Sequence, residues 1–107
     1  PEKDWDWYAI SYHKDLNIEL IEKYRSKKWD WNLISRHDNI KMEWIEKHPT
    51  WNWCWNTITI NNNVDLEWFE KHPEWNWCWE FIHYNSNFKS EWIEKLPEIK
   101  KFNQLHN

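Results

Sequence analysis

Two cysteines and two histidines are the residues of this chain whose types and spacing suggest metal or redox chemistry. Cys54 and Cys78 lie 24 residues apart, and so do His48 and His72. Thiolates and imidazoles are ligands that zinc prefers, and two cysteines could also form a disulfide. The shared spacing raises the question of whether these residues form one site or stand at equivalent positions of a repeated structure.

The spacing argues against both kinds of site. Equivalent positions on stacked helices lie about 8–10 Å apart, whereas a disulfide requires Cα atoms within about 7 Å. Other repeats replace these cysteines and histidines with residues that do not form one converging set of ligands, namely Asp6, Asp30, Phe102, Tyr24 and Leu96. A position that accepts leucine or phenylalanine serves packing, so we expect no metal ion, no disulfide and no cofactor.

The remaining candidates for catalysis are carboxylates. Glutamates recur with a lysine four residues later, as in Glu67 and Lys71, which is the favourable order on a helix and indicates a solvated ridge. No Ser-His-Asp or Cys-His arrangement can be picked out from the repeated positions and turns. The chain also contains no glycine, on which phosphate-binding loops and dinucleotide-binding motifs depend. We therefore expect that the protein is not an enzyme.

A shift of 24 residues aligns the whole chain on itself without a gap. Positions that recur four times include Trp7, Trp31, Trp55 and Trp79, as well as Ile10, Ile34, Ile58 and Ile82. We expect a single repeat domain over residues 1–107, with repeats 1–24, 25–48, 49–72 and 73–96. The partial repeat 97–107 has Lys101 and Asn103 where tryptophan is expected, which indicates a C-terminal cap.

Each repeat contains two segments that predict short helices. In the third repeat, apolar residues at i, i+3, i+4 and i+7 predict a helix over 49–59 with Pro49 in its first turn. The second segment, 64–72, is amphipathic, with Asn63 or Asp65 as its N-cap. Because the chain lacks glycine, we expect histidine or asparagine to supply positive φ in the turn between the helices.

Two short helices cannot bury their apolar faces alone, so the repeats must stack. The predicted fold is all-α, an α-solenoid of tandem 24-residue helix-turn-helix repeats with a tryptophan and isoleucine core. The alternative is an α/β solenoid of the leucine-rich-repeat type, since residues 51–55 alternate as a strand does and 24 residues suit such a repeat.

Composition limits the partners. The chain has 18 acidic and 14 basic residues, giving a net charge of -4, which disfavours nucleic acid. No long apolar run is present, so we expect no membrane partner. Two cysteines in a chain with 13 tryptophans suggest a reducing, intracellular compartment.

The repeat with Pro-Glu-Trp-Asn-Trp-Cys-Trp, an Asn-rich turn and Glu-Trp-Ile-Glu-Lys-His-Pro resembles the short tryptophan-rich tandem repeats of giant-virus proteins over the whole chain. The resemblance implies a viral or viral-like origin and a setting in the host cytoplasm or virion. It supplies no catalytic residues. The chain departs from that pattern at its turns, where Lys14, Asp38, Asn62 or Ser86 stands in place of an expected proline.

The turns also carry paired residues: His13-Lys14, His37-Asp38, Asn61-Asn62 and Asn85-Ser86. These pairs are similar to the base-reading pairs of TAL-effector repeats, which implies that the first residue braces a loop and the second meets a DNA base. The repeat here is shorter, lacks the loop glycines and is less basic. A plainer interpretation, which we favour, is that histidine and asparagine tolerate the turn geometry and that their neighbours are simply exposed.

We expect a non-enzymatic scaffold that recognises a partner protein through these turns. The residues just before the pairs vary while the core does not, and variation on one face of a fixed scaffold is how repeat proteins encode recognition. The candidate binding face, here called the turn edge, comprises the four pairs together with Tyr12, Arg36, Ile60 and Tyr84. The alternatives are DNA reading through the pairs, and a structural component of a viral particle or filament that self-associates through open solenoid ends.

Overall fold

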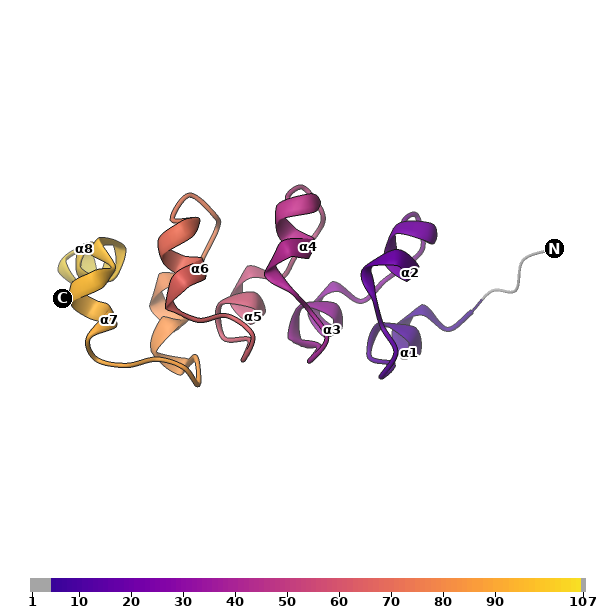
Figure 1. Ribbon diagram of the computed structural model, residues 1–107, viewed down its shortest axis with the longest axis horizontal. Helices are drawn as coiled ribbons and strands as arrows, with labels where there is room; N and C mark the ends of the chain where they lie inside the picture. Colours follow the sequence, from indigo (N-terminus) through magenta and orange to yellow (C-terminus); the bar gives the residue numbers. More distant parts are fainter. Residues whose placement is uncertain (1–4, 107) are drawn as a thin grey trace. The chain divides into compact units, whose positions relative to one another are not determined.

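The computed structural model describes residues 5–106, and every regular element in that range is helical (Figure 1). The elements are α1 (Trp7–Ser11), α2 (Ile18–Lys23), α3 (Trp31–Arg36), α4 (Met42–Lys47), α5 (Trp55–Thr59), α6 (Leu66–Lys71), the 3₁₀ helix η1 (Trp79–Tyr84), α7 (Trp92–Lys95) and α8 (Pro97–His106). The all-α prediction is confirmed. The leucine-rich-repeat alternative is wrong, because no residue within 5–106 lies in a β-strand.

The first helix of the third repeat begins at Trp55, later than the predicted start at Pro49. Residues 49–54 are not helical. Trp51 and Trp53 are buried while Asn52 between them is exposed, which is the alternation of an extended chain. The indole Nε1–H of Trp53 donates to the carbonyl oxygen of His48 (2.8 Å) and fixes this segment against the preceding turn. The predicted helical stripe over 51–58 was therefore wrong in its first half.

The described prolines of the repeats lie either in a turn after a helix or at the first position of a helix. Pro49 and Pro73 lie in turns that follow α4 and α6, so they end the second helix rather than begin the next one. Pro97, in contrast, is the first residue of α8, where its missing N–H costs no hydrogen bond.

Aspartate and asparagine cap several of the short helices. The Asp30 carboxylate accepts a hydrogen bond from the Leu33 N–H (3.0 Å) at α3, and the Asn17 side chain accepts one from the Leu20 N–H (2.9 Å) at α2. Each bond satisfies one of the amide groups that a helix N-terminus leaves unpaired. Asp65 occupies the predicted N-cap position of α6, but its side chain makes no capping hydrogen bond.

The contacts of the chain divide it into an N-terminal half, Pro1–Cys54, and a C-terminal half, Trp55–Asn107. In the N-terminal half, α1 packs against α3 (Figure 1). In the C-terminal half, α5 packs against η1, and α8 packs against both η1 and α7. Each half therefore contains first helices of successive repeats packed on one another.

Buried hydroxyl groups join successive repeats inside each half. The Ser11 hydroxyl donates to the Trp7 carbonyl oxygen (2.6 Å) and accepts a hydrogen bond from the Asp30 N–H of the next repeat (2.9 Å). The second of these bonds recurs from the Cys54 N–H to Ser35 (2.9 Å) and from the Cys78 N–H to Thr59 (2.9 Å). All three hydroxyl residues are 0% exposed, so these bonds satisfy hydroxyl groups that water cannot reach. His83 takes the equivalent position in the fourth repeat and is exposed.

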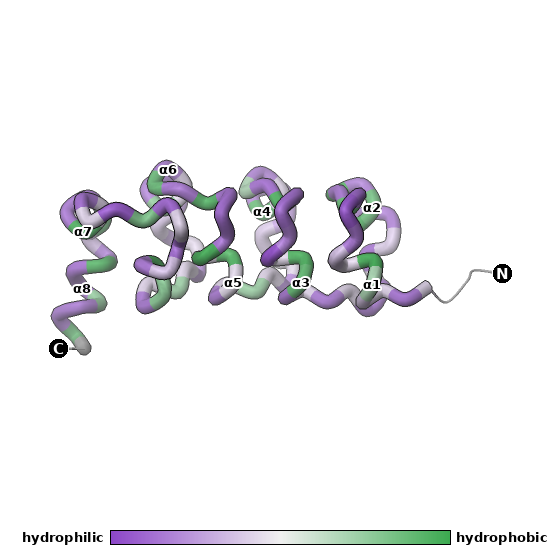
Figure 2. The backbone as a smooth tube through the Cα atoms, turned by 90° about the horizontal axis from the view of Figure 1, so that it is seen from below, coloured by the Kyte–Doolittle hydropathy of each residue, from purple (hydrophilic) through white to green (hydrophobic). Residues whose placement is uncertain are grey.

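Tryptophan rings fill the interior between repeats, as the sequence predicts. In the N-terminal half Trp31 meets Trp53 edge to face at 5.2 Å, and in the C-terminal half Trp55 meets Trp77 in the same way at 5.4 Å. Among the tryptophans of the described residues, Trp5 alone has an exposed side chain (40%). Figure 2 shows hydrophobic and hydrophilic residues alternating along the backbone, and the core draws on helices and on connections, since Ile45 and Trp53 are both buried.

Candidate recognition surface

The first residue of each turn pair binds the backbone of its own turn. His13 and His37 accept a hydrogen bond through Nδ1 from the N–H two residues later (3.1 and 2.9 Å). Asn61 and Asn85 accept the same bond through Oδ1 (2.8 Å in both). The two side-chain types are interchangeable here because Nδ1 of histidine and Oδ1 of asparagine lie at the same distance along the side chain. We call these four the brace residues.

The predicted role of the brace residues in supplying positive φ was wrong. No residue within 5–106 has a positive φ, and His37 and Asn85 have extended backbones with φ of -65° and -66°. The turns therefore need no glycine. They require a side chain that accepts a hydrogen bond from the backbone, which is why histidine and asparagine recur in them.

The brace residues of the second and fourth repeats also bind the preceding turn. The Nε2 atom of His37 lies 2.7 Å from the His13 carbonyl oxygen. Because a carbonyl oxygen only accepts, Nε2 carries the ring hydrogen and donates this hydrogen bond. The Asn85 amide donates to the carbonyl oxygens of Thr59 (2.9 Å) and Val64 (3.0 Å), with a longer contact to that of Asn61 (3.3 Å). Within each half, a brace residue therefore holds two successive turns together: His37 in the N-terminal half and Asn85 in the C-terminal half.

Two of the brace residues do not belong to an accessible face. Asn61 and Asn85 are 7% and 3% exposed, so the structure places these two members of the candidate binding face in the interior. His37 is half-buried, and only His13, which begins the series, is exposed. For Asn85 the physical reason is its bonds to the preceding turn, which place the amide between two turns.

Sequence reasoning missed a second bracing position two residues further on. The Asn39 amide donates to the carbonyl oxygens of Lys14 (2.8 Å) and Leu16 (3.0 Å). In the C-terminal half, Asn87 makes the equivalent bonds to Asn62 (2.9 Å) and Val64 (3.0 Å). The recurrence of asparagine at 39, 63 and 87 was the available signal. The same asparagines also fit the pattern of helix N-caps, which is the role that the sequence predicts for Asn63.

The other turn-edge residues are exposed: Tyr12, Lys14, Arg36 and Asp38 in the N-terminal half, and Ile60, Asn62, Tyr84 and Ser86 in the C-terminal half. The Ser86 hydroxyl donates to the Asn62 side-chain oxygen (2.7 Å). Tyr12, Ile60 and Tyr84 expose large side chains, with exposed fractions of 56%, 40% and 68%. Together with His13, these eight residues form the accessible part of the turn edge.

A groove of about 380 Å³ follows the turn edge of the N-terminal half. Its lining comprises Tyr12, Lys14, Leu33, Arg36, His37, Asp38 and Asn39. Five of these residues belong to the predicted binding face, while Leu33 and Asn39 do not. The structure therefore brings most of the predicted residues of this half around one concave surface.

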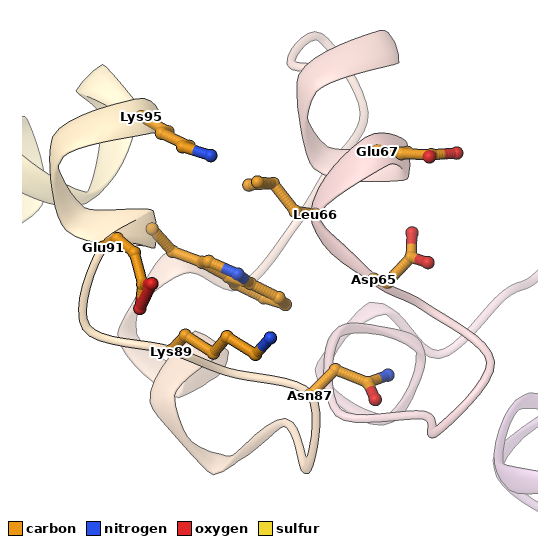
Figure 3. Close-up of a pocket in the computed structure, with 8 residues that line it drawn as sticks. Asp65, Leu66, Glu67, Asn87, Lys89, Glu91 and Lys95 are labelled. Atoms are coloured by element: carbon orange, nitrogen blue, oxygen red, sulfur yellow. The ribbon is translucent and has the colours of Figure 1, made fainter.

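A second groove, of about 410 Å³, lies in the C-terminal half between α6 and the segment that contains α7, and its lining includes no member of the turn pairs (Figure 3). Lys89 and Lys95 extend toward α6, while Glu67 extends away from the groove. Asp65 and Glu91 also line it, so positive and negative groups are mixed. This groove has no single charge with which to select a ligand.

The histidines that suggested a metal site take part in structural contacts. The Nε2 atom of His48 lies 2.7 Å from the Glu22 carboxylate, and the His48 ring stacks on Trp51 at 3.8 Å. Lys47 also reaches Glu22 (2.8 Å), which belongs to the preceding repeat. Hydrogen bonds from Lys47 and then from His48 lower the pKa of the Glu22 carboxyl. This contact links α2 to α4.

In the C-terminal half, His72 pairs locally. Its Nδ1 atom lies 2.9 Å from the Glu74 carboxylate, and its ring stacks on Trp75 at 3.9 Å. The hydrogen bond from His72 lowers the pKa of Glu74. Within residues 5–106, no three His, Cys, Asp or Glu side chains are arranged to hold a metal ion.

Both cysteines are free thiols and half-buried. Burial raises the pKa of the Cys78 thiol, and so does the adjacent Glu80, to which the thiol donates a hydrogen bond (3.4 Å). A raised pKa lowers the thiolate fraction, which is the opposite of what a nucleophile needs. No helix in the described part of the chain is long and apolar enough to cross a membrane.

Comparisons with protein-family models, curated proteins and solved structures find no match to this chain. The resemblance to giant-virus tandem repeats therefore stays a prediction. Any account of function must start from the turn edge itself.

Proposed function

We propose that the protein is a non-enzymatic repeat scaffold that recognises a partner protein through the exposed turn edge. One observation carries the proposal: within each turn, the bracing side chain is bound to backbone, while its neighbours are exposed and differ between repeats. A side chain that contributes nothing to the turn can vary without cost to the fold. Such variation over a fixed backbone is the basis of recognition in repeat proteins.

The exposed aromatic side chains favour a protein partner. Tyr12 and Tyr84 are more than half exposed, and each is supported by a neighbouring ring, Tyr8 at 5.6 Å and His83 at 4.2 Å. Tyrosine gives a large contact area at a low cost in conformational entropy and is enriched at protein interfaces. Exposed tyrosines held by their neighbours are therefore suitable anchors.

We further propose that the scaffold is one continuous α-solenoid over residues 1–107. The sequence register passes Cys54 and Trp55 without a gap, and both halves repeat the same hydroxyl bond between successive repeats. Small-angle X-ray scattering tests this. We expect the profile of one rigid, elongated particle, whereas the profile of two flexibly joined bodies would contradict the continuous solenoid.

Affinity capture from source cells tests the recognition function. The bait is the full chain, and the matched variant replaces Tyr12, Arg36 and Tyr84 by alanine. We expect at least one protein to be retained by the original chain, lost with the variant, and unaffected by nuclease treatment. If both baits retain the same proteins equally, the turn edge is not the recognition surface.

A second candidate function is DNA binding, and a specific observation favours it. In the pair His37-Asp38 the first residue is bound to the backbone while the second is exposed, which is the division of roles that the similarity to TAL-effector repeats implies. The net charge of -4 opposes contact with phosphates. A fluorescence-anisotropy titration with duplex DNA at low salt decides the matter, because an absence of binding there excludes this function.

A further inference from the structure

The groove in the N-terminal half joins an apolar surface to positive charge. Among its lining residues, Leu33 is half-buried and Tyr12 exposes 56% of its surface. Tyr8 packs edge to face on Tyr12 at 5.6 Å and is itself 58% exposed, so the apolar surface continues beyond the groove. This surface can accommodate an aliphatic or aromatic side chain of a partner.

Two cations and one anion line the same groove. Lys14 and Arg36 contribute positive charge, and Asp38 offsets one of them. The Arg36 guanidinium donates to the Asn32 side-chain oxygen (3.3 Å), a contact one helical turn away that orients the planar group. A guanidinium carries five N–H donors, so one such bond leaves donors for a carboxylate. The groove therefore favours a ligand with negative charge.

The walls of the groove are held in place before any ligand binds. The His37 ring is bonded at both nitrogens, to the His13 carbonyl oxygen and the Asn39 N–H. Asn39 in turn donates to two carbonyl oxygens of the preceding turn. A site whose backbone is already ordered binds a flexible ligand at a lower entropic cost.

We propose that this groove binds a short acidic peptide segment of the partner protein. The apolar side chain of the segment packs on Tyr12 and Leu33, and its carboxylates pair with Lys14 and Arg36. The proposal rests on the recognition function proposed above and specifies the chemistry of the partner. A peptide fits better than a nucleic acid for two reasons. The groove has two cations beside one anion, too few positive charges to pair with a row of phosphates. The protein itself also contains 18 acidic residues, which repel a nucleic acid.

A direct test is fluorescence anisotropy with a fluorescein-labelled Asp-Glu-Phe-Asp-Glu peptide and the full chain. The comparison probes are Asn-Gln-Phe-Asn-Gln, Lys-Lys-Phe-Lys-Lys and a short DNA duplex. We expect the acidic peptide to bind most tightly and its affinity to fall as salt is raised. No binding of the acidic peptide at protein concentrations up to about 1 mM would overturn the proposal.

Charge variants locate the binding. Replacing both Lys14→Gln and Arg36→Gln should weaken the acidic peptide about tenfold, since two exposed ion pairs are lost. The matched control, Lys95→Gln with Lys101→Gln, removes two exposed positive charges from the C-terminal half and should leave the affinity unchanged. Equal weakening by both double variants would overturn the proposal, because it would reflect net charge alone. Circular dichroism melts of both variants serve as the control for folding, and we expect both to melt as the original chain does.

The outcome is separable from that of the recognition function. If the partner protein is lost with the alanine variant of Tyr12, Arg36 and Tyr84 but retained by the Lys14→Gln, Arg36→Gln chain, recognition stands and the acidic-segment proposal fails. If the acidic peptide binds at the groove but no cellular protein depends on the turn edge, the recognition function fails instead.

Discussion

The two halves of the molecule share the bonds that form their turns and differ in what those turns expose. Asn39 in the N-terminal half and Asn87 in the C-terminal half each donate to two carbonyl oxygens of the preceding turn. The accessible edge carries Lys14, Arg36 and Asp38 in the first half, whereas Ile60, Asn62, Tyr84 and Ser86 in the second are uncharged. Backbone geometry and surface chemistry are therefore set by separate residues in this chain.

The largest effect should come from a core position that occurs in both halves. Ile45 and Phe69 stand at the same repeat position in the two halves, and both are 0% exposed. Ile45→Ala should lower the free energy of unfolding by about 2–5 kcal/mol and Phe69→Ala by about 3–5 kcal/mol. Urea denaturation measures both values. A substitution that lowers the stability of only one of two separate transitions would show that the halves unfold independently and contradict the continuous solenoid.

The brace residues should come next. Asn85 is buried and donates to backbone carbonyl oxygens, so Asn85→Ala should lower the free energy of unfolding by about 2–3 kcal/mol. His37 is less buried, and His37→Ala should have a smaller effect, about 1 kcal/mol. Equilibrium unfolding compares the two. The reverse order would mean that the halves do not share one bracing arrangement.

The buried hydroxyls offer an isosteric test. Thr59→Val keeps the side-chain shape but leaves the Cys78 N–H without its acceptor, which should cost about 1–3 kcal/mol. The N-terminal counterpart, Ser35→Ala, removes the acceptor of the Cys54 N–H and should cost a similar amount. His83→Ala is the matched control, because His83 occupies the same repeat position but is exposed. His83→Ala should change the free energy of unfolding by no more than about 0.5 kcal/mol. A larger loss would show that the exposed position matters for stability as the buried ones do.

The smallest effect should be a change in pH dependence. The folded-state pKa of Glu22 is lowered by Lys47 and His48, so its contribution to stability is present above the ordinary carboxyl value of 4.5 and is lost as pH falls through the lower folded pKa. Glu22→Gln should therefore flatten the acid side of the stability profile, and Glu74→Gln should do the same in the other half. Urea midpoints at a series of acidic pH values measure this. An unchanged profile would show that these carboxylate contacts do not contribute to stability.

The sequence predicts much of the fold because the repeat is strict. The recurrence of tryptophan and isoleucine predicts an all-helical chain with ring-filled interfaces, and Trp31 with Trp53 illustrates those interfaces. The helix over 49–59 failed because Trp51 and Trp53 also fit a pattern of alternate burial. The Trp53 indole is fixed by its bond to the His48 carbonyl oxygen, five residues earlier, and a pattern of apolar residues does not reveal this bond.

The candidate site was predicted in part for the same reason. Exposure of Tyr12 and Tyr84 follows from their variation between repeats and was found from the sequence. The inward position of Asn61 and Asn85 was missed, because a short polar residue in a turn looks the same whether it faces solvent or bonds to backbone. The Asn85 amide also binds the preceding turn, at the carbonyl oxygens of Thr59 and Val64, which lie about one repeat away in sequence.

The separation of brace from edge is tested most directly by urea denaturation of the chain in which Tyr12, Arg36 and Tyr84 are replaced by alanine. All three side chains are exposed, so we predict a free energy of unfolding within about 1 kcal/mol of that of the original chain. A large loss of stability, or a chain that no longer folds, would show that the edge maintains the structure and would contradict the proposal that it serves recognition.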